Sequence, residues 1–371
     1  MVEKIIEQYK EVFDKYGYPA ELPELQQKYK NGELGLEANI EKGNIQIPYE
    51  KDILSLPEKN TAEYRELKEL GEEAIRKDEL GVAILNGGMA TRFGGCVKGV
   101  VEVYDRETFL GLKMKDARNV AAKYNAKLPV FIMNSFQTEG PTEEYLEDNQ
   151  YFGCDDVHLF NQLISVRLDE KGEVYIGGDG KPSLHGPGHG DFSFAFADSG
   201  LLEDFIEQGG KHLMFSNCDN LGATVDPAII GYHIQQGNEM TVETAQKHKG
   251  DKGGAPAYVD GKLQVVEGFR FPEDFDQDLI PVFNTNNFVF DAKVLQKETI
   301  LSWYVAKKKV ENQPVVQFER LVGELSKDLK TGFITVPRQG VETRFLPIKD
   351  RNDLEKAREI MKEVAEYRIL P

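Results

Sequence analysis

The sequence predicts an α/β protein with a mixed, mostly parallel central sheet and helices on both faces. From residue 81 onward, short apolar runs alternate with stretches of helical periodicity, and this alternation is typical of α/β units. The apolar runs are GVAILN, LPVFIMN, HLMFSN, MTVETA and VFNTNNFVF. Three of them end in asparagine. Ligands of such sheets bind beyond the carboxyl ends of the strands, so these polar ends predict where a site lies.

Residues 1–78 are predicted to form a mainly helical N-terminal region, and residues 79–371 the α/β domain. The segment KNTAEYRELKELGEEAIRKDE carries the clearest helical pattern, with Asn60 as a possible cap and Glu63 three residues later. One face of this helix collects its small and apolar residues, namely Tyr64, Leu67, Gly71, Ala74 and Ile75. This face is expected to be buried.

Two later segments alternate around glycine-containing turns and predict antiparallel hairpins, ISVRLDEKGEVYIGGDGKPSL and APAYVDGKLQVVEG. After residue 290 the pattern predicts two helices, then the extended segment TGFITVPRQGVETRFLPIK, then a last helix over DLEKAREIMKEVAEY.

Composition limits the classes of function. The chain has 371 residues and a formal net charge of −18, which argues against a nucleic-acid-binding surface. No apolar run is long enough to span a bilayer, and the N-terminus lacks the apolar core of a signal peptide. The three cysteines form no CxxC pair, so we expect a reduced, cytoplasmic setting without a zinc site.

The segment LNGGMATRFGGCVKG, which follows the first apolar run, combines five glycines with two cations. Glycines after a strand let backbone amides approach a ligand, and Arg92 and Lys98 add positive charge. The spacing matches neither GxGxxG nor GxxxxGK[ST]. A phosphate-binding loop is favoured over the alternative, a tight turn with a solvated lysine.

Four further segments carry polar side chains in irregular contexts. GPGHGDF must be a shaped loop that presents His189 to a ligand, or else a surface turn. In FSNCDNLGATVDP, Asp219 stands at the end of a strand, which suits a Mg²⁺ ligand or an Asx-turn residue. The amides of FNTNN suit a polyhydroxyl ligand such as a sugar. ETRFLPIKD brings Arg344 and Lys349, and Lys349 either reaches phosphates or is surface charge.

Taken in order, these segments resemble one family, the eukaryotic-type UDP-glucose pyrophosphorylases, with the wider group of UDP-sugar and UDP-N-acetylhexosamine pyrophosphorylases. The resemblance runs from about residue 60 to the C-terminus. It is carried by LNGGMATRFGG, MNSFQT, FNQ, GPGHGD, SNCDNLGATVDP, KGG, FNTNN and RFLPIK. It implies a Rossmann-like nucleotidyltransferase fold of the GT-A-like type. The implied reaction joins UTP and a sugar 1-phosphate to give UDP-sugar and pyrophosphate, with Mg²⁺.

The resemblance also implies roles for individual residues. Asp219 would hold Mg²⁺; Lys98, with Arg92, would neutralise the leaving pyrophosphate; and Lys349 would bind the phosphate of the sugar 1-phosphate. The nucleotide would lie under the loop of Leu85, Asn86, Gly87 and Gly88. Gln162 and the backbone of Gly188 would read the uracil edge. Lys247 and His189 would add phosphate-side or sugar-side contacts, and the hexose would meet Asn217, Gly254, Glu267 and Asn287.

Some features depart from the family pattern. Ala90 replaces a glycine of the loop, and TRFGG is closer to the N-acetylhexosamine branch, whereas GPGHGD and RFLPIK favour the glucose branch. Glucose 1-phosphate is the expected substrate, with galactose 1-phosphate or an N-acetylhexosamine 1-phosphate as alternatives, and these mixed motifs leave the choice among the sugars open. Relatives carry a C-terminal β-helix domain used for assembly, and the sequence ends at Pro371, so a different assembly or a monomer is expected.

Two other classes of protein are considered. A dinucleotide-dependent oxidoreductase would carry a spaced GxGxxG motif, which is absent from the sequence. A non-catalytic protein that binds nucleotide sugars would be expected to lose Lys98, Asp219 or Lys349, and all three are present.

Overall fold

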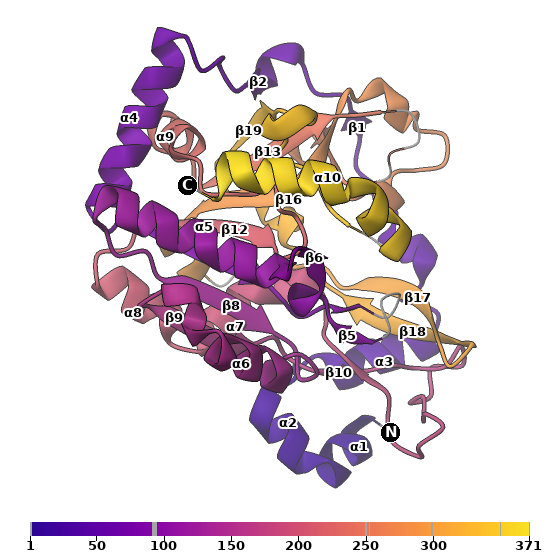
Figure 1. Ribbon diagram of the computed structural model, residues 1–371. Coiled ribbons are helices and arrows are strands. Elements are labelled where there is room, and N and C mark those ends of the chain that lie inside the picture. The colour runs from indigo at the N-terminus through magenta and orange to yellow at the C-terminus, as the bar shows by residue number, and fades with distance from the viewer. Residues whose placement is uncertain are drawn as a thin grey trace.

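The computed structural model describes residues 2–90, 95–248, 251, 253–297, 300–348 and 350–370. Its centre is an eight-stranded sheet in the order β2-β19-β13-β16-β12-β3-β8-β9 (Figure 1). In that order the strands are Ile53–Ser55, Thr331–Val336, Met240–Gln246, Val282–Asp291, His212–Asn217, Leu80–Leu85, Val130–Asn134 and Val157–Asn161. Every neighbouring pair is parallel except the two pairs that β16 makes with β12 and β13. The predicted mixed, mostly parallel sheet is confirmed.

The register of the parallel strands brings their carboxyl ends to one edge of the sheet. Asn217 of β12 is aligned with Leu85 of β3, and Leu85 is aligned with Met133 of β8. The loops that follow these strands therefore start side by side, which places the glycine loop beside the loop that carries Asp219.

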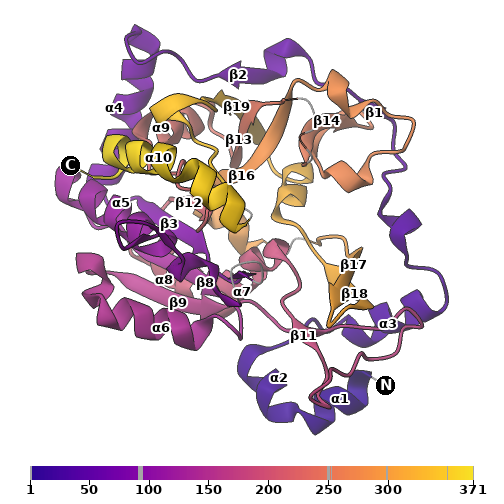
Figure 2. The same cartoon turned by 45° about the vertical axis from the view of Figure 1, so that its right-hand side comes forward.

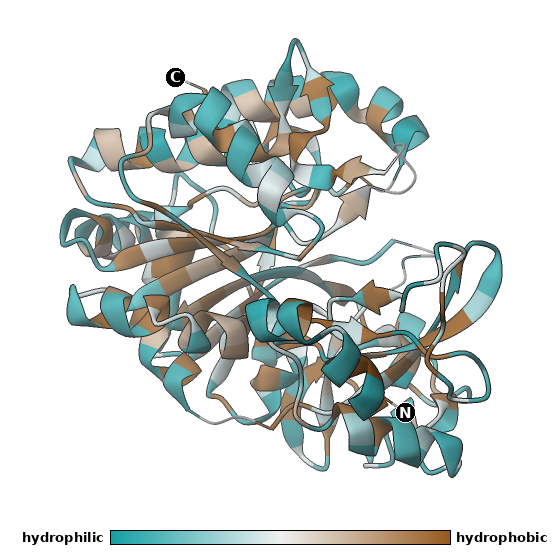
Figure 3. Cartoon of the chain, turned by 90° about the horizontal axis from the view of Figure 1, so that it is seen from below, coloured by the Kyte–Doolittle hydropathy of each residue, from teal (hydrophilic) through white to brown (hydrophobic). Residues whose placement is uncertain are grey.

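Successive residues of the central strands pack into two different cores. In β3, Val82 and Ile84 join one cluster with the helices α4 (Ala62–Arg76), α5 (Phe109–Tyr124) and α9 (Pro227–Gln236). Ala83 and Leu85 join the opposite cluster with α7 (Phe192–Asp198) and α8 (Leu201–Glu207). This alternation is that of a strand buried on both faces. Figure 3 shows brown central strands flanked by helices with teal segments.

Helix α4 confirms the face predicted from its periodicity, because Tyr64, Leu67, Gly71, Ala74 and Ile75 are all buried. Its N-cap is Thr61, whose side chain accepts a hydrogen bond from the amide of Tyr64, rather than Asn60. The helix lies unusually close to α9. A Cβ on Gly71 would lie 1.9 Å from the carbonyl oxygen of Pro227, and one on Gly231 1.7 Å from that of Leu67. The two glycines are what allows the helices to approach each other.

The N-terminal residues are mostly helical, as predicted, but they also contribute strands. The helices are α1 (Val2–Gln8), α2 (Lys10–Tyr16) and α3 (Leu22–Lys30). Figure 2 shows α3 beside the hairpin of β17 (Tyr304–Val310) and β18 (Gln313–Glu319). Further along, β1 (Ile45–Gln46) pairs with β14 (Ala255–Val259), and β2 extends the central sheet. The boundary between residues 78 and 79 remains a prediction.

Both predicted hairpins are present. The first contains β10 (Ser165–Val166) and β11 (Leu184–His185), and the second contains β14 (Ala255–Val259) and β15 (Lys262–Val266). The shorter strands are β4 (Met89–Ala90), β5 (Cys96–Val97), β6 (Glu102–Tyr104) and β7 (Glu107–Thr108). The remaining helices are α6 (Glu139–Asp148) and α10 (Arg351–Arg368). Among the described residues, no helix combines the length and apolar character needed to cross a membrane.

The two helices predicted after residue 290 are wrong. In their place, β17 (Tyr304–Val310) and β18 (Gln313–Glu319) form an antiparallel hairpin, with short 3₁₀ segments on either side. The turn residues Glu311 and Asn312 both have positive φ, at 51° and 62°. Such angles at two consecutive residues are typical of a tight hairpin turn. The tyrosine, valines and phenylalanine of the two strands favour β structure, and this preference outweighs the charged, helix-like run AKKK.

Candidate active site

A cavity of about 520 Å³ opens at the carboxyl edge of the central sheet. It lies where the loops after β3, β8, β9 and β12 meet the loop 186–190. Many of the residues predicted from the sequence line it, namely Leu85, Gly87, Gly88, Lys98, Gln162, Gly188, His189, Asn217 and Asp219. Segments far apart in the sequence are thus brought into one cavity, as the phosphate-loop hypothesis requires.

Gln162 is held between two glycines on one wall of the cavity. A Cβ on Gly87 would lie 2.7 Å from Gln162 Nε2, and a Cβ on Gly186 would lie 2.2 Å from the same atom. The backbone amide of Gln162 donates to the carbonyl of Asn134 at 2.9 Å, which anchors it to the end of β8. Because any side chain at either glycine would collide with the amide, the orientation of Gln162 depends on both.

Lys98 and Asp219 form an ion pair at the edge of the cavity. The amide of Lys98 donates to the carbonyl of Gly88 at 3.2 Å, so the β4–β5 hairpin returns the chain to the glycine loop. The amide of Cys218 donates to the carbonyl of Leu85 at 3.0 Å, which fixes the start of the Asp219 loop against β3. The side chains of Lys98 and Asp219 are 23% and 14% exposed, so both remain within reach of a ligand.

Asn86 lies beneath the glycine loop rather than in the cavity. Its side chain is buried, and its Nδ2 donates to Asn134 Oδ1 at 3.0 Å and to Thr142 Oγ1 at 2.8 Å. A Cβ on Gly99 would lie 2.2 Å from Asn86 Oδ1. Asn86 therefore supports the backbone next to Lys98 and does not line this cavity, and its role in nucleotide binding stays a prediction.

The glycine–histidine loop is a shaped loop, as predicted, and it presents His189 to the cavity. Gly188 has a φ of 92°, and a Cβ there would lie 2.6 Å from the carbonyl oxygen of Arg320. His189 Nδ1 accepts a hydrogen bond from the amide of Val322 at 3.1 Å, which leaves the proton of the neutral ring on Nε2. Burial lowers the pKa of His189 to about 4, so its imidazole is neutral near pH 7.

Asp191 ties this loop to the segment that carries Gln162. Its Oδ2 accepts from the amide of Leu163 at 2.6 Å, and its other oxygen pairs with Arg320. Both side chains of the pair are buried. The carboxylate of Asp191, which directly follows Gly190, thus holds the backbone next to Gln162.

A second group of predicted residues runs from the cavity along β16. Asn286 Nδ2 donates to Asn217 Oδ1 at 3.2 Å, and the amide of Asn286 donates to Asn284 Oδ1 at 2.9 Å. The amide of Asn284 in turn donates to the carbonyl of Gly254 at 2.7 Å. A Cβ on Gly254 would lie 3.0 Å from Glu267 Oε2. Burial raises the pKa of Glu267 to about 7, an effect that Arg270 opposes.

Asn217, Gly254 and Glu267 are therefore linked through the start of β16, although Gly254 and Glu267 do not line the cavity itself. The residue that reaches Asn217 is Asn286, which the sequence analysis did not single out within FNTNN. The predicted Asn287 is fully buried instead, and its Nδ2 donates to the carbonyl of Arg344 at 3.3 Å. Asn286 has a φ of 60° at an irregular point of β16, and there its side chain, rather than that of Asn287, reaches Asn217.

Of three other predicted residues, one is placed elsewhere and two lie outside the described residues. Lys247 Nζ donates to the carbonyl of Gln277 at 2.7 Å and lies 3.5 Å from Asp278 Oδ1, away from the cavity lining. Arg92 and Lys349 lie outside the described residues.

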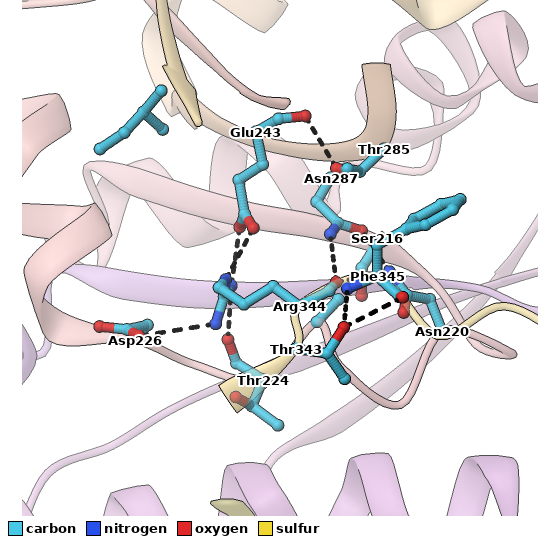
Figure 4. Close-up of polar contacts among 12 residues, drawn as sticks. Ser216, Asn220, Thr224, Asp226, Glu243, Thr285, Asn287, Thr343, Arg344 and Phe345 are labelled. Carbon is cyan, nitrogen blue, oxygen red and sulfur yellow. Dashed lines mark hydrogen bonds and ion pairs between the residues drawn. The ribbon is translucent and has the colours of Figure 1, made fainter. Parts of the chain in front are cut away.

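Arg344, from the same motif as Lys349, is buried. It holds residues 337–348, which follow β19 and are called the late segment here, against the sheet. Figure 4 shows its guanidinium between Glu243 on one side and Thr224 and Asp226 on the other. It donates to both carboxylate oxygens of Glu243 at 2.7 Å and to the carbonyl of Thr224 at 3.0 Å. Asn220, next to Asp219, donates from Nδ2 to the carbonyl of Arg344 at 3.1 Å. The segment that leads to position 349 is thereby bound to the Asp219 loop.

The cavity also has lining residues that the sequence analysis missed, among them Arg167, His185 and Gln317. Arg167 Nε donates to Gln317 Oε1 at 3.0 Å, which joins the hairpin of β10 and β11 to β18. No local motif marks these residues, because their meeting depends on how two hairpins pair in space. Gly186 also lines the cavity, and its place in the GPGHGD motif was the signal that could have marked it.

The donor set fits a divalent cation bound together with a phosphorylated ligand. Among the described residues, no three His, Cys, Asp or Glu side chains are grouped as a metal site. Asp219 offers a single carboxylate at the cavity edge. Mg²⁺ is commonly held by one or two carboxylates plus substrate phosphates, which matches one acidic residue facing a glycine loop.

Comparison with known sequences identifies relatives along most of the chain. The family model for UTP–glucose-1-phosphate uridylyltransferase matches residues 36–364. The curated enzyme of that name from Encephalitozoon cuniculi (strain GB-M1) is 30% identical over 316 residues, which cover 80% of this chain and 62% of the relative. The one from Hordeum vulgare is 32% identical over 298 residues, covering 75% and 61%. The chain thus spans less than two thirds of the length of these curated relatives.

Solved structures share the fold at low sequence identity. A putative UDP-N-acetylglucosamine pyrophosphorylase from Entamoeba histolytica has a TM-score of 0.74 at 21% identity, covering 88% of both chains. UDP-glucose phosphorylase from Trypanosoma brucei has a TM-score of 0.70 at 23% identity, covering 90% of this chain and 78% of the other. A mutant of UDP-glucose pyrophosphorylase from Leishmania major, in complex with UDP-glucose, has a TM-score of 0.72 at 24% identity, covering 93% and 76%. These likenesses support the nucleotidyltransferase-like fold.

Proposed function

Since the chain belongs to the UTP–glucose-1-phosphate uridylyltransferase family, we propose that it converts UTP and glucose 1-phosphate to UDP-glucose and pyrophosphate. The observation that carries the proposal is that Lys98 and Asp219 meet at the edge of a cavity that Gln162 and the glycine loop also line. A site for a nucleoside triphosphate requires a cation, a carboxylate for the metal, backbone amides for the phosphates and a side-chain amide that recognises the base.

The uracil is read by Gln162 and the backbone of Gly188 in this proposal. A carboxamide presents a donor and an acceptor side by side, and these match the acceptor and donor on the uracil edge. The glycines at positions 87 and 186 hold that carboxamide in place, which supports a fixed pattern of readout. A site built to pair such groups strongly disfavours a base with the wrong pattern.

Transfer proceeds by in-line attack of the sugar phosphate oxygen on the α-phosphorus of UTP, and pyrophosphate leaves. No covalent intermediate is needed, so the chain contributes positioning and charge neutralisation. Lys98 accompanies the leaving pyrophosphate, with Arg92 as a second cation. Lys349 binds the phosphate of the sugar 1-phosphate and reduces the repulsion between the two anionic substrates.

Asp219 would hold Mg²⁺ together with phosphate oxygens of the nucleotide. When bound there, the ion would neutralise charge on the phosphates and orient them. Asp219 is paired with Lys98 in the structure, so binding of the metal–nucleotide complex would exchange this partner for the cation and free Lys98 to contact phosphate.

The sugar would lie toward the start of β16. Asn217 and Asn286 offer amides at the cavity, and Gly254 and Glu267 continue the same polar track. Carboxamides and a carboxyl group of raised pKa both donate and accept hydrogen bonds, which suits the hydroxyls of a hexose. We also infer a cytoplasmic setting, because the described cysteines, Cys96, Cys154 and Cys218, are all free thiols.

The proposal is tested by a pyrophosphate-release assay. UTP is supplied with glucose 1-phosphate, galactose 1-phosphate or N-acetylglucosamine 1-phosphate, with Mg²⁺ or with a chelator. The expected result is Mg²⁺-dependent release that is fastest with glucose 1-phosphate. Release that is faster with another sugar would change the assigned substrate, and no release with any sugar would overturn the proposed reaction.

A further inference from the structure

We propose that Lys113 is a positioning residue whose buried ammonium group fixes the loop that carries Asp219 and so sets how tightly the site holds a divalent cation. The inference rests on the proposed function, because it assigns Asp219 to the metal. It concerns a residue outside the cavity lining and outside every motif that the sequence analysis singled out.

Lys113 bridges the two ends of the Asp219 loop from behind. It lies on α5, and only 3% of the residue is exposed. Its Nζ donates to Ser216 Oγ at 3.1 Å, near the end of β12, and to the carbonyl oxygen of Ala223. The residues between these contacts, 217–222, contain Asp219. One ammonium group therefore holds both ends of this short loop together.

Asp116 extends the attachment by one further contact. It lies three residues after Lys113 on α5, is also buried, and accepts a hydrogen bond from the amide of Val225 at 2.8 Å. Burial lowers the pKa of Lys113, and the neighbouring Asp116 opposes that shift. Arg344 also acts on both groups, so the pair belongs to the charged cluster that holds the late segment.

The energetics favour a positioning role over a purely stabilising one. Burying a lysine and a carboxylate costs desolvation energy that their attraction need not recover, and apolar replacements of such pairs are often tolerated by the fold. Lys113→Met, however, removes only one of the two groups and leaves Asp116 buried without it, so the variant is expected to be less stable than the wild type. Circular dichroism establishes that it is folded before Mn²⁺ is added. What methionine cannot replace is the pair of hydrogen bonds that fix Ser216 and Ala223 relative to each other.

A further anchor of the loop lies on the opposite side. Asn220 donates to Asn287 Oδ1 at 3.2 Å and accepts from the amide of Leu346 at 2.8 Å. Within the loop, the amide of Asn220 donates to the carbonyl of Asn217 at 3.3 Å, and the amide of Ala223 donates to that of Asn220 at 3.2 Å. Asp219 thus stands between an anchor on β16 and the late segment and an anchor on α5. Loss of Lys113 removes the α5 contacts to Ser216 and Ala223 and leaves only that of Asp116 with Val225.

The test measures cation binding without turnover. Water-proton relaxation is followed as Mn²⁺ is added to the full chain with UTP and no sugar phosphate, because Mn²⁺ on the protein relaxes water differently from Mn²⁺ bound to free UTP. Supporting contacts of metal ligands are typically worth about 10- to 100-fold in metal affinity. Lys113→Met is expected to weaken Mn²⁺ binding to the UTP complex by about 10-fold or more.

The matched control is Lys115→Met on the same helix. Lys115 pairs with Glu107, away from the Asp219 loop, so the substitution removes the same charge from the same helix without a contact to that loop. It is expected to leave Mn²⁺ affinity unchanged. Equal Mn²⁺ affinities in Lys113→Met, Lys115→Met and the wild type would overturn the proposal, as would an equal loss in both variants.

A second variant covers the case in which Lys113→Met fails to fold. Ser216→Ala removes only the hydroxyl that Lys113 contacts, and a smaller loss of Mn²⁺ affinity in the same direction is expected. Wild-type affinity in Ser216→Ala would then overturn the proposal. A wild-type protein that binds no Mn²⁺ with UTP would instead overturn the proposed function, so the two failures are distinguishable.

Discussion

Lys98 lines the cavity directly after β5, which pairs with β4, and β4 directly follows Gly88 in the chain. The amide of Lys98 also donates to the carbonyl of Gly88, so the backbone at Lys98 is fixed beside the glycine loop. Such a side chain can exchange its carboxylate partner for a phosphate with little movement of the backbone. Its ion pair with Asp219 is partly exposed, so it contributes little to folding stability compared with its value in binding an anion.

We expect Lys98→Ala to lower kcat by about 100-fold or more while the protein stays folded, because one charged contact to a transition state is worth roughly 3 kcal/mol. The measurement is steady-state pyrophosphate release together with thermal melting. Lys77→Ala, on an exposed ion pair with Glu73, serves as the control and should retain wild-type kcat. Comparable kcat values in the two variants would remove Lys98 from the reaction.

Gly186→Ala is expected to disturb base recognition. A Cβ at this position would lie 2.2 Å from Gln162 Nε2, so the amide must move away from the position in which it reads the base. We expect KM for UTP to rise by about 10-fold, on the order of one lost hydrogen bond, with partial loss of the preference for UTP over CTP. Gly140→Ala is the control, since a Cβ at Gly140 meets nothing within 4 Å. An unchanged KM in Gly186→Ala would contradict the role of Gln162.

At the scale of elements, what the sequence predicted well were strands and helices with strong periodicity. The ends of β3, β8 and β12 and the buried face of α4 follow from local patterns alone. The β17–β18 hairpin was missed because the lysines of its exposed face interrupt the apolar alternation and imitate a helix surface. Arg344 was singled out as a cation, but its pairing with Glu243 joins segments about 100 residues apart, which local sequence reasoning does not reach.

The close contact between α4 and α9 predicts how a substitution at Gly71 changes the stability of the fold. Gly71→Ala should lower the free energy of unfolding by about 2 to 3 kcal/mol, because its methyl group would lie 1.9 Å from the carbonyl oxygen of Pro227 and would force the helices apart. Urea denaturation followed by circular dichroism measures this. Gly140→Ala, on the exposed side of α6, should have little effect. A wild-type unfolding midpoint in Gly71→Ala would show that the helices can separate without cost.

At the scale of the whole molecule, the chain keeps several histidines neutral by burying them. Burial lowers the pKa of His185 and His189 to about 4, and it lowers the pKa of His233 to about 3, with His212 adding to the last effect. In each case the folded state binds fewer protons than the unfolded state below about pH 6.5. The stability that depends on these neutral histidines is therefore fully present above that pH. It is lost progressively as pH falls toward 4, because protons bind preferentially to the unfolded state. Glu267, whose pKa is raised to about 7, acts in the opposite sense.

A single histidine can be isolated from this balance. His233 accepts or donates at Thr241 Oγ1 through Nδ1 at 2.9 Å, and glutamine can keep that contact without titrating. Between pH 7 and pH 5, the free energy of unfolding should fall by about 2 kcal/mol more in the wild type than in His233→Gln. Urea denaturation at the two pH values measures the difference. Parallel pH dependences would show that His233 does not couple folding to protons.

The reversed direction of β16 has a consequence for how the two substrates meet. Because β16 runs against β12, its first residues lie beside the last residues of that strand, and Asn286 comes to face Asn217. A sugar held beside the start of β16 and a nucleotide held at the carboxyl ends of β12, β3 and β8 would then share one edge of the central sheet. Because both substrates would be bound along this one sheet, their alignment for the reaction would not require two domains to move toward each other.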